Sequence, residues 1–289
     1  MTTEAITQSA TTIQTTGIEL NALKPTELAS FYEEKIGLTL LSKDDAGKIY
    51  HLGTPDGTVL ISIYPATTEK SQRTTGLYHL ALLLPTRGDL GGMLRHLLEN
   101  QVNVEGASDH GYSEALYLPD PEGNGIEIYA DKDRSEWDIK DNGLIGGIVI
   151  ALDAEGVLSS QEVPFTGIPN GTTMGHIHLH VNDIESTLSF YHEVMGLGLK
   201  FIMNEAALFM ATQDYHHHLG ANLWNGRNIP AAQDGTQGLR NSVWSGSAED
   251  LKAIQAKLTD IGHEFTKDGE TLYFKDPAGT GIILKFIKQ

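Results

Sequence analysis

The stretch GIELNALKPTELASFYEEKIGLTL at residues 17–40 returns as HIHLHVNDIESTLSFYHEVMGLGL at residues 176–199. Phe31-Tyr32 and Phe190-Tyr191 align at an offset of 159 residues, and Gly-Leu follows each pair after four residues. Each stretch starts with the alternation of a strand and continues into an amphipathic helix that ends at Gly37 or Gly196. The chain therefore repeats a strand–helix unit.

A second pair of segments extends this repeat. GLYHLALLLP at 76–85 resembles GLRNSVW at 238–244. Each is followed by a helical pattern and then by a strand, a turn and another strand, ALYLPDPEGNGIEIYAD or TLYFKDPAGTGIILKFI. The Asp-Pro-x-Gly at 120–123 and 276–279 is typical of a tight turn between two strands.

Four copies of one unit account for most of the chain. A repeat of about 50 residues defines an architecture, and here it predicts an α+β fold of four βαβββ modules that form two curved-sheet barrels. The modules are expected at residues 15–65, 75–131, 172–225 and 236–288. Residues 1–14 form a polar lead-in, the halves are 15–131 and 172–289, and residues 132–171 link them.

Composition narrows the class of protein. The formal net charge of the 289 residues is -18, and a surface this acidic repels phosphate backbones and anionic lipids. We therefore expect no nucleic-acid or membrane partner. There are no cysteines, which excludes thiolate chemistry, so any metal must be held by His and carboxylate groups. The N-terminus has no signal-peptide pattern, and we expect a cytoplasmic protein.

The repeat allows the same two positions to be compared in every module. These are the first inward position of the first strand and the inward position of the last strand. From the first module to the fourth, the pairs are Gly17 and Ile61, His79 and Glu127, His176 and Leu219, and Asn241 and Ile283. Ligand-type residues thus occur only in modules two and three.

His79, His176 and Glu127 are the set that binds non-heme Fe(II) on one face and leaves the opposite face open. An isolated His is more often structural, but Glu127 stands between two isoleucines on a strand. A buried carboxylate is costly unless it is paired, protonated or bound to metal. Because the three ligands must converge, we predict that modules two and three pair across the halves of the chain.

These residues resemble the vicinal oxygen chelate superfamily, and within it the extradiol catechol 2,3-dioxygenases. The most specific segment is DHGYSEALYLPDPEGNGIEIYAD, followed by GHIHLHV and YHHHLGANLW. The resemblance covers nearly the whole chain after residue 15 and implies His79, His176 and Glu127 as ligands of Fe(II), with Mn(II) as the alternative ion. In many two-half relatives the ligands lie in modules three and four, whereas here they lie in two and three.

The resemblance also implies catalytic residues. The family's Tyr ten residues before the carboxylate ligand matches Tyr117, and its His-Gly-x-Ser segment places a His at His110. The acid–base His falls in the run 216–218. Strand alternation relative to Leu219 favours His217, with His218 as the second candidate. His178 and His180 share a face with His176 and are expected to support the site without binding the metal.

The implied reaction is oxidative cleavage of a catechol or substituted catechol with O₂, next to the two hydroxyls. A neutral His beside the substrate suits the proton transfers that this chemistry needs. Two alternatives remain open at this stage: another metal enzyme of the same fold, of glyoxalase or resistance type, and a protein that only binds an aromatic ligand. The fold is also compatible with a homo-oligomer.

Overall fold

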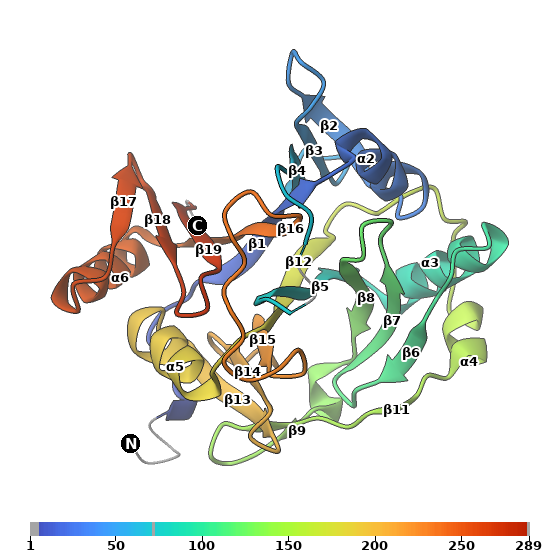
Figure 1. Ribbon diagram of the computed structural model, residues 1–289. Coiled ribbons are helices and arrows are strands. Elements are labelled where there is room, and N and C mark those ends of the chain that lie inside the picture. Colours follow the sequence, from blue (N-terminus) through green and yellow to red (C-terminus); the bar gives the residue numbers. More distant parts are fainter. Residues whose placement is uncertain (1–5, 71–72, 288–289) are drawn as a thin grey trace.

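The computed structural model describes residues 6–70 and 73–287. Each expected module contains a strand, a helix and three further strands (Figure 1). The first two modules comprise β1 (Gln14–Ala22), α2 (Pro25–Glu34), β2 (Thr39–Lys43), β3 (Tyr50–Gly53), β4 (Val59–Pro65), and β5 (Gly76–Leu83), α3 (Arg87–Glu99), β6 (Gly106–Asp109), β7 (Ser113–Pro119), β8 (Gly125–Asp131).

The last two modules have the same order, except that the helix of the third ends in a π-helical turn. They comprise β12 (Thr173–His180), α5 (Ile184–Ser189), the π turn (Phe190–Val194), β13 (Gly198–Met203), β14 (Ala207–Ala211), β15 (Leu219–Asn222), and β16 (Gly238–Gly246), α6 (Ala248–Asp260), β17 (Phe265–Asp268), β18 (Thr271–Lys275), β19 (Gly281–Phe286).

The modules pair across the halves of the chain, as predicted. One sheet has eight strands in the order β17-β18-β19-β16-β1-β4-β3-β2, and the other has β11-β6-β7-β8-β5-β12-β15-β14-β13. The blue first module therefore lies beside the red fourth module in Figure 1. In the nine-stranded sheet, the antiparallel pairing of β5 with β12 sets His79 opposite His178. This junction joins modules two and three.

The segment between the halves carries short elements of its own. They are a 3-10 turn (Arg134–Glu136), β9 (Asp138–Ile139), β10 (Ile145–Gly146), β11 (Ile150–Ala151) and α4 (Ala154–Ser159). β11 pairs with β6, so part of the segment extends the nine-stranded sheet at its edge. The linker therefore packs against the second module, through the pairing of β11 with β6.

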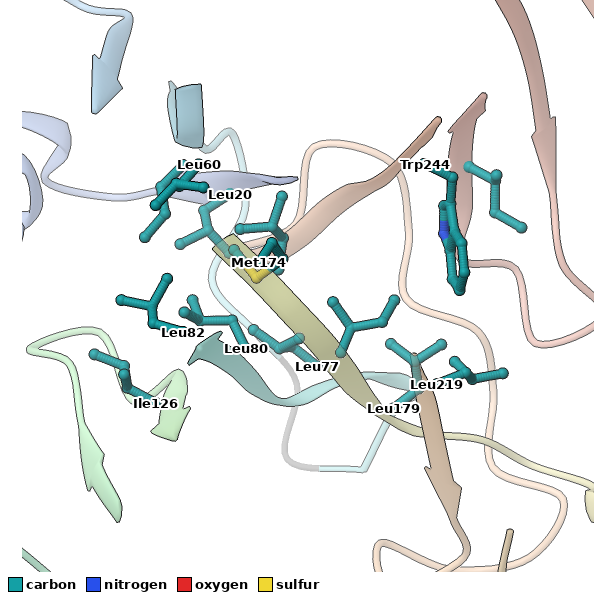
Figure 2. Packing of buried hydrophobic residues seen from close by; sticks show 14 of the residues in the cluster. Leu20, Leu60, Leu77, Leu80, Leu82, Ile126, Met174, Leu179, Leu219 and Trp244 are labelled. Carbon is teal, nitrogen blue, oxygen red and sulfur yellow. The ribbon is translucent and has the colours of Figure 1, made fainter. Parts of the chain in front are cut away.

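Alternation along the strands separates a core face from a site face. On β12, Ile177 and Leu179 are buried in the main apolar cluster, while His176 and His178 occupy the alternate positions. Figure 2 shows Leu20 of one sheet near Met174 of the other, so residues of both sheets contribute to a continuous core. The face of β12 that carries His176 and His178 is therefore available for a functional site.

The repeated Gly-Leu has a steric reason. Gly37 and Gly196 both have a positive φ, of 84° and 76°. A Cβ on Gly37 would lie 2.9 Å from Cα of Gly167, so a side chain would also collide with the linker. Only glycine meets both conditions without strain.

Two buried hydrogen bonds connect the repeated Phe-Tyr to the repeated Asp-Pro turns. Tyr32 Oη donates to Asp120 Oδ2 at 2.9 Å, and Tyr191 Oη donates to Asp276 Oδ2 at 3.1 Å. Each bond joins a helix of one sheet to a turn of the other sheet. The two motifs that revealed the repeat therefore tie the sheets together.

The register corrects two of the positions compared between modules. Residues paired in parallel strands point to the same face, and Glu127 pairs with Ala81, two residues after His79. In module three, the position equivalent to Glu127 is Gly220, which pairs with His178. In module one it is Ser62, which pairs with Glu19. The prediction of Leu219 and Ile61 was wrong, because both residues lie in the apolar core.

The fourth module agrees with the prediction, since Ile283 pairs with Val243, two residues after Asn241. Neither Gly220 nor Ser62 is a usual Fe(II) ligand, so the contrast between modules remains. Among the helices in the described part of the chain, none is long and apolar enough to cross a membrane.

Candidate metal centre

Three buried side chains from three adjacent strands converge on one point. His79 is on β5, Glu127 on β8 and His176 on β12, and they are 6%, 4% and 1% exposed. The two Nε2 atoms are 3.3 Å apart, and each lies 3.1 Å from Oε2 of Glu127. In the described part of the chain, this is the one group of three such residues whose ligand atoms all lie within 4.8 Å.

This arrangement fits a metal ion. Ligand atoms about 2.1 Å from one ion, and at right angles to each other, are about 3 Å apart. The three observed separations match that value, so the atoms can occupy one face of an octahedron. Two imidazoles and one carboxylate on one face are typical of non-heme Fe(II) centres that bind substrate and O₂ opposite.

The protonation of the triad also suits a cation. Burial lowers the pKa of His176 to about 4, so its imidazole is neutral at pH 7. Burial works against the charge of Glu127, but the interactions of this carboxyl with His176 and His79 outweigh that effect and hold its pKa well below its usual range. A neutral imidazole and an ionised carboxylate are the forms that bind metal.

His79 and Glu127 form part of the wall of a cavity of about 470 Å³, large enough for a single aromatic ring with substituents. Its wall is mainly aromatic and aliphatic, and in the described ranges it contains neither Lys nor Arg. The residues that line it are Tyr78, His79, Ser108, His110, Tyr112, Tyr117, Glu127, Gly147, Ile148, Val149, His178, Phe201, Met203, Phe209, His217 and Trp224.

Tyr117 and His110 meet in this wall. Nδ1 of His110 lies 3.0 Å from the carbonyl oxygen of Ile148, which can only accept, so Nδ1 carries the proton. In the neutral ring, Nε2 then accepts from the Tyr117 hydroxyl at 2.6 Å. Burial, with the nearby charge of Glu127, raises the pKa of Tyr117 well above its usual range. The phenol keeps its proton and a fixed orientation beside the triad.

The two acid–base candidates, His217 and His218, line different cavities. His217 lines the cavity, and its ring centroid is 4.1 Å from that of His176. His218 instead borders another cavity, beside Thr15 and Tyr215, and its Nδ1 accepts from the amide of Thr212 at 3.3 Å. His218 therefore does not line the triad's cavity.

Strand alternation was not a valid reason for preferring His217. Residues 215–218 are irregular, and β15 begins only at Leu219. Burial, together with the neighbouring His176 and His216, lowers the pKa of His217 well below its usual range, so the ring is neutral at pH 7. A neutral ring can accept a proton.

His178 and His180 lie on the same face as His176 but differ in their surroundings. His178 lines the cavity, and its buried Nε2 has no hydrogen-bond partner among the described residues. His180 Nδ1 lies 2.8 Å from Oδ1 of Asn222 and does not line the cavity. The face shared with His176 was predicted, but the different environments were not.

Several cavity residues gave no signal in the sequence. Ile148 and Val149 come from the segment treated as a linker, and their apolar run is the one hint of a packed role. Tyr112 lies in the HGYS segment, yet only the structure shows that its ring stacks on His216 at 4.3 Å. Contacts of this kind depend on tertiary packing.

Comparisons with known proteins identify the family of this chain. The family model described as Glyoxalase/Bleomycin resistance protein/Dioxygenase superfamily matches residues 18–128 and 173–284. A protein of Bacillus subtilis (strain 168) named "Catechol-2,3-dioxygenase" is 37% identical over 266 residues, 89% of this chain and 91% of its own length. A second relative, "Biphenyl-2,3-diol 1,2-dioxygenase 3" of Rhodococcus globerulus, is 28% identical over 100 residues, 35% of this chain and 48% of its own.

Structural comparison supports the fold. Glyoxalase I from Zea mays superposes with a TM-score of 0.58 at 12% identity, over 95% of this chain and 92% of its own. The chain therefore belongs to the Glyoxalase/Bleomycin resistance protein/Dioxygenase superfamily and is an enzyme of the extradiol dioxygenase type.

Proposed function

We propose that this enzyme cleaves the ring of catechol or a substituted catechol with O₂, using Fe(II) held by His79, His176 and Glu127. One observation carries the proposal: the three ligand atoms lie 3.1–3.3 Å apart beside an aromatic-lined cavity, with His217 and Tyr117 also in its wall. The 37% identity to a protein named for this reaction supports it.

When bound, the ion would offer sites for two vicinal hydroxyls and O₂ and would favour loss of a hydroxyl proton. The chain's own residues do the rest. His217, neutral and beside His176, is placed to take a proton from a catechol hydroxyl and to return it later. The Tyr117 oxygen, whose proton points to His110, is left to accept a hydrogen bond from the substrate.

The cavity wall selects the substrate by shape and charge. Phe201, Phe209 and Trp224 can pack against an aromatic ring and its apolar substituents. Because no Lys or Arg lines the described part of the wall, a carboxylate substituent would enter without a counter-charge. We therefore expect uncharged catechols to be the better substrates.

The test is anaerobic loading with Fe(II), followed by catechol and O₂, with O₂ uptake and absorbance recorded together. We expect O₂ consumption matched by a yellow ring-opened product. No O₂ uptake with several catechols at full iron occupancy would reject the proposal. Turnover of a glyoxalase-type substrate instead would favour another enzyme of this fold, and catechol binding that survives Glu127→Ala, without turnover, would favour a binding protein.

A further inference from the structure

We propose that Asp131 and His216 are positioning residues that orient His217 and fix which of its nitrogens carries the proton. This inference rests on the proposed function for its catalytic consequence. Two short contacts define the relay: Oδ1 of Asp131 lies 3.0 Å from Nε2 of His216, and the Nδ1 atoms of His216 and His217 are 2.7 Å apart.

The donors and acceptors allow one consistent pattern when both rings are neutral. An ionised carboxylate can only accept, so Nε2 of His216 carries the proton. Nδ1 of His216 is then an acceptor, and Nδ1 of His217 must donate to it. Nε2 of His217 is left with a free lone pair, which is the form a base needs.

The packing around His216 keeps this pattern in place. Its side chain is 1% exposed, and its ring stacks on Tyr112 with an interplanar angle of 16°. Tyr215 and Trp137 also contact the ring, at 4.1 Å and 5.2 Å between centroids. A ring held on these sides cannot turn away from His217 without repacking its neighbours.

The relay depends on the pairing of modules two and three. Asp131 is the last residue of β8, whereas His216 and His217 come just before β15. They meet because β8 and β15 belong to the same nine-stranded sheet.

The test compares His216→Phe with His216→Asn. Phenylalanine keeps the stack on Tyr112 but removes the acceptor, whereas the amide oxygen of asparagine can replace Nδ1 as the acceptor for His217. In the Fe(II)-loaded enzyme with catechol and O₂, we expect His216→Phe to lower kcat about 10- to 100-fold at equal iron content, a range typical of outer-sphere partners. His216→Asn should recover most of this loss, and KM should change less than kcat.

A second readout does not depend on turnover. In Zn(II)-loaded protein with ¹⁵N-labelled histidine, NMR should show the proton of His217 on Nδ1, and a mixture of tautomers in His216→Phe. A proton on Nε2 in the wild type, or an unchanged tautomer in His216→Phe, would overturn the relay. If the tautomer is as expected but no catechol is turned over, the proposed function fails and the relay stands.

Discussion

His217 and His218 are adjacent in sequence, but only His217 lines the cavity beside the triad. We predict that His217→Gln lowers kcat for catechol by about 100- to 10,000-fold, because a positioned acid–base group contributes a factor of this size. Steady-state O₂ uptake at equal iron content measures the effect.

His218→Gln is the matched control, since the two residues are neighbours in the sequence but His218, which is half-buried, does not line the cavity. Its kcat should stay close to that of the wild type. Equal losses in both variants, or wild-type kcat in His217→Gln, would contradict the role given to His217.

At this scale, the sequence predicted the cluster of candidate ligands better than its surroundings. His79, His176 and Glu127 were found by comparing modules, and the structure brings them together. Two of the compared positions were one residue out, at Ile61 and Leu219, because strand register depends on pairing with a neighbour. Sequence alone does not contain that information.

At the scale of single elements, the Asp-Pro turns have a structural role that the sequence did not predict. Asp276 is buried, with 4% exposure, and accepts hydrogen bonds from Tyr191 and from the amide of Thr280. Burial raises the pKa of its carboxyl to about 6, from an ordinary value of 3.8. The folded protein therefore holds a proton at pH 5 that the unfolded chain releases.

The effect on stability has a definite sign. Below pH 3.8 the carboxyl is protonated in both states, so it has no effect. Between 3.8 and 6 only the folded state keeps the proton, and stability falls as pH rises, by up to about 3 kcal/mol in all, at about 1.4 kcal/mol for each unit.

Asp276→Asn should remove this fall. Urea unfolding of both proteins at pH 4 to 7 should give a variant that gains stability relative to the wild type as pH rises. Because other carboxylates titrate in the same range, the comparison uses the difference between the two proteins. A difference that does not change with pH would contradict the raised pKa.

At the scale of the whole molecule, each sheet is built from both halves of the chain. His79 and Glu127 lie in the first half and His176 in the second, so the proposed metal centre needs both halves. This pairing was predicted from the ligands alone, since pairing within each half would have separated them. Two features were not predicted: the tyrosine–aspartate hydrogen bonds between the sheets, and the part of the cavity wall that residues 147–149 form. Both arise from packing between segments that are distant in the sequence.

A split chain tests this organisation. Residues 6–170 and 171–287, produced separately, should each bind Fe(II) only weakly, because neither fragment contains all three ligands. Mixing the fragments should restore one tight site in equilibrium dialysis. Tight, stoichiometric Fe(II) binding by either fragment alone would contradict pairing across the halves.

The most direct test of the central claim is anaerobic Fe(II) binding to the full chain and to variants of the triad. We predict one tight Fe(II) per chain in the wild type and in the control His218→Gln. His79→Ala, His176→Ala and Glu127→Ala should each weaken binding more than about 100-fold, since even outer-sphere changes cost 10- to 100-fold. Unchanged Fe(II) affinity in any of the three variants, or no tight site in the wild type, would contradict the account.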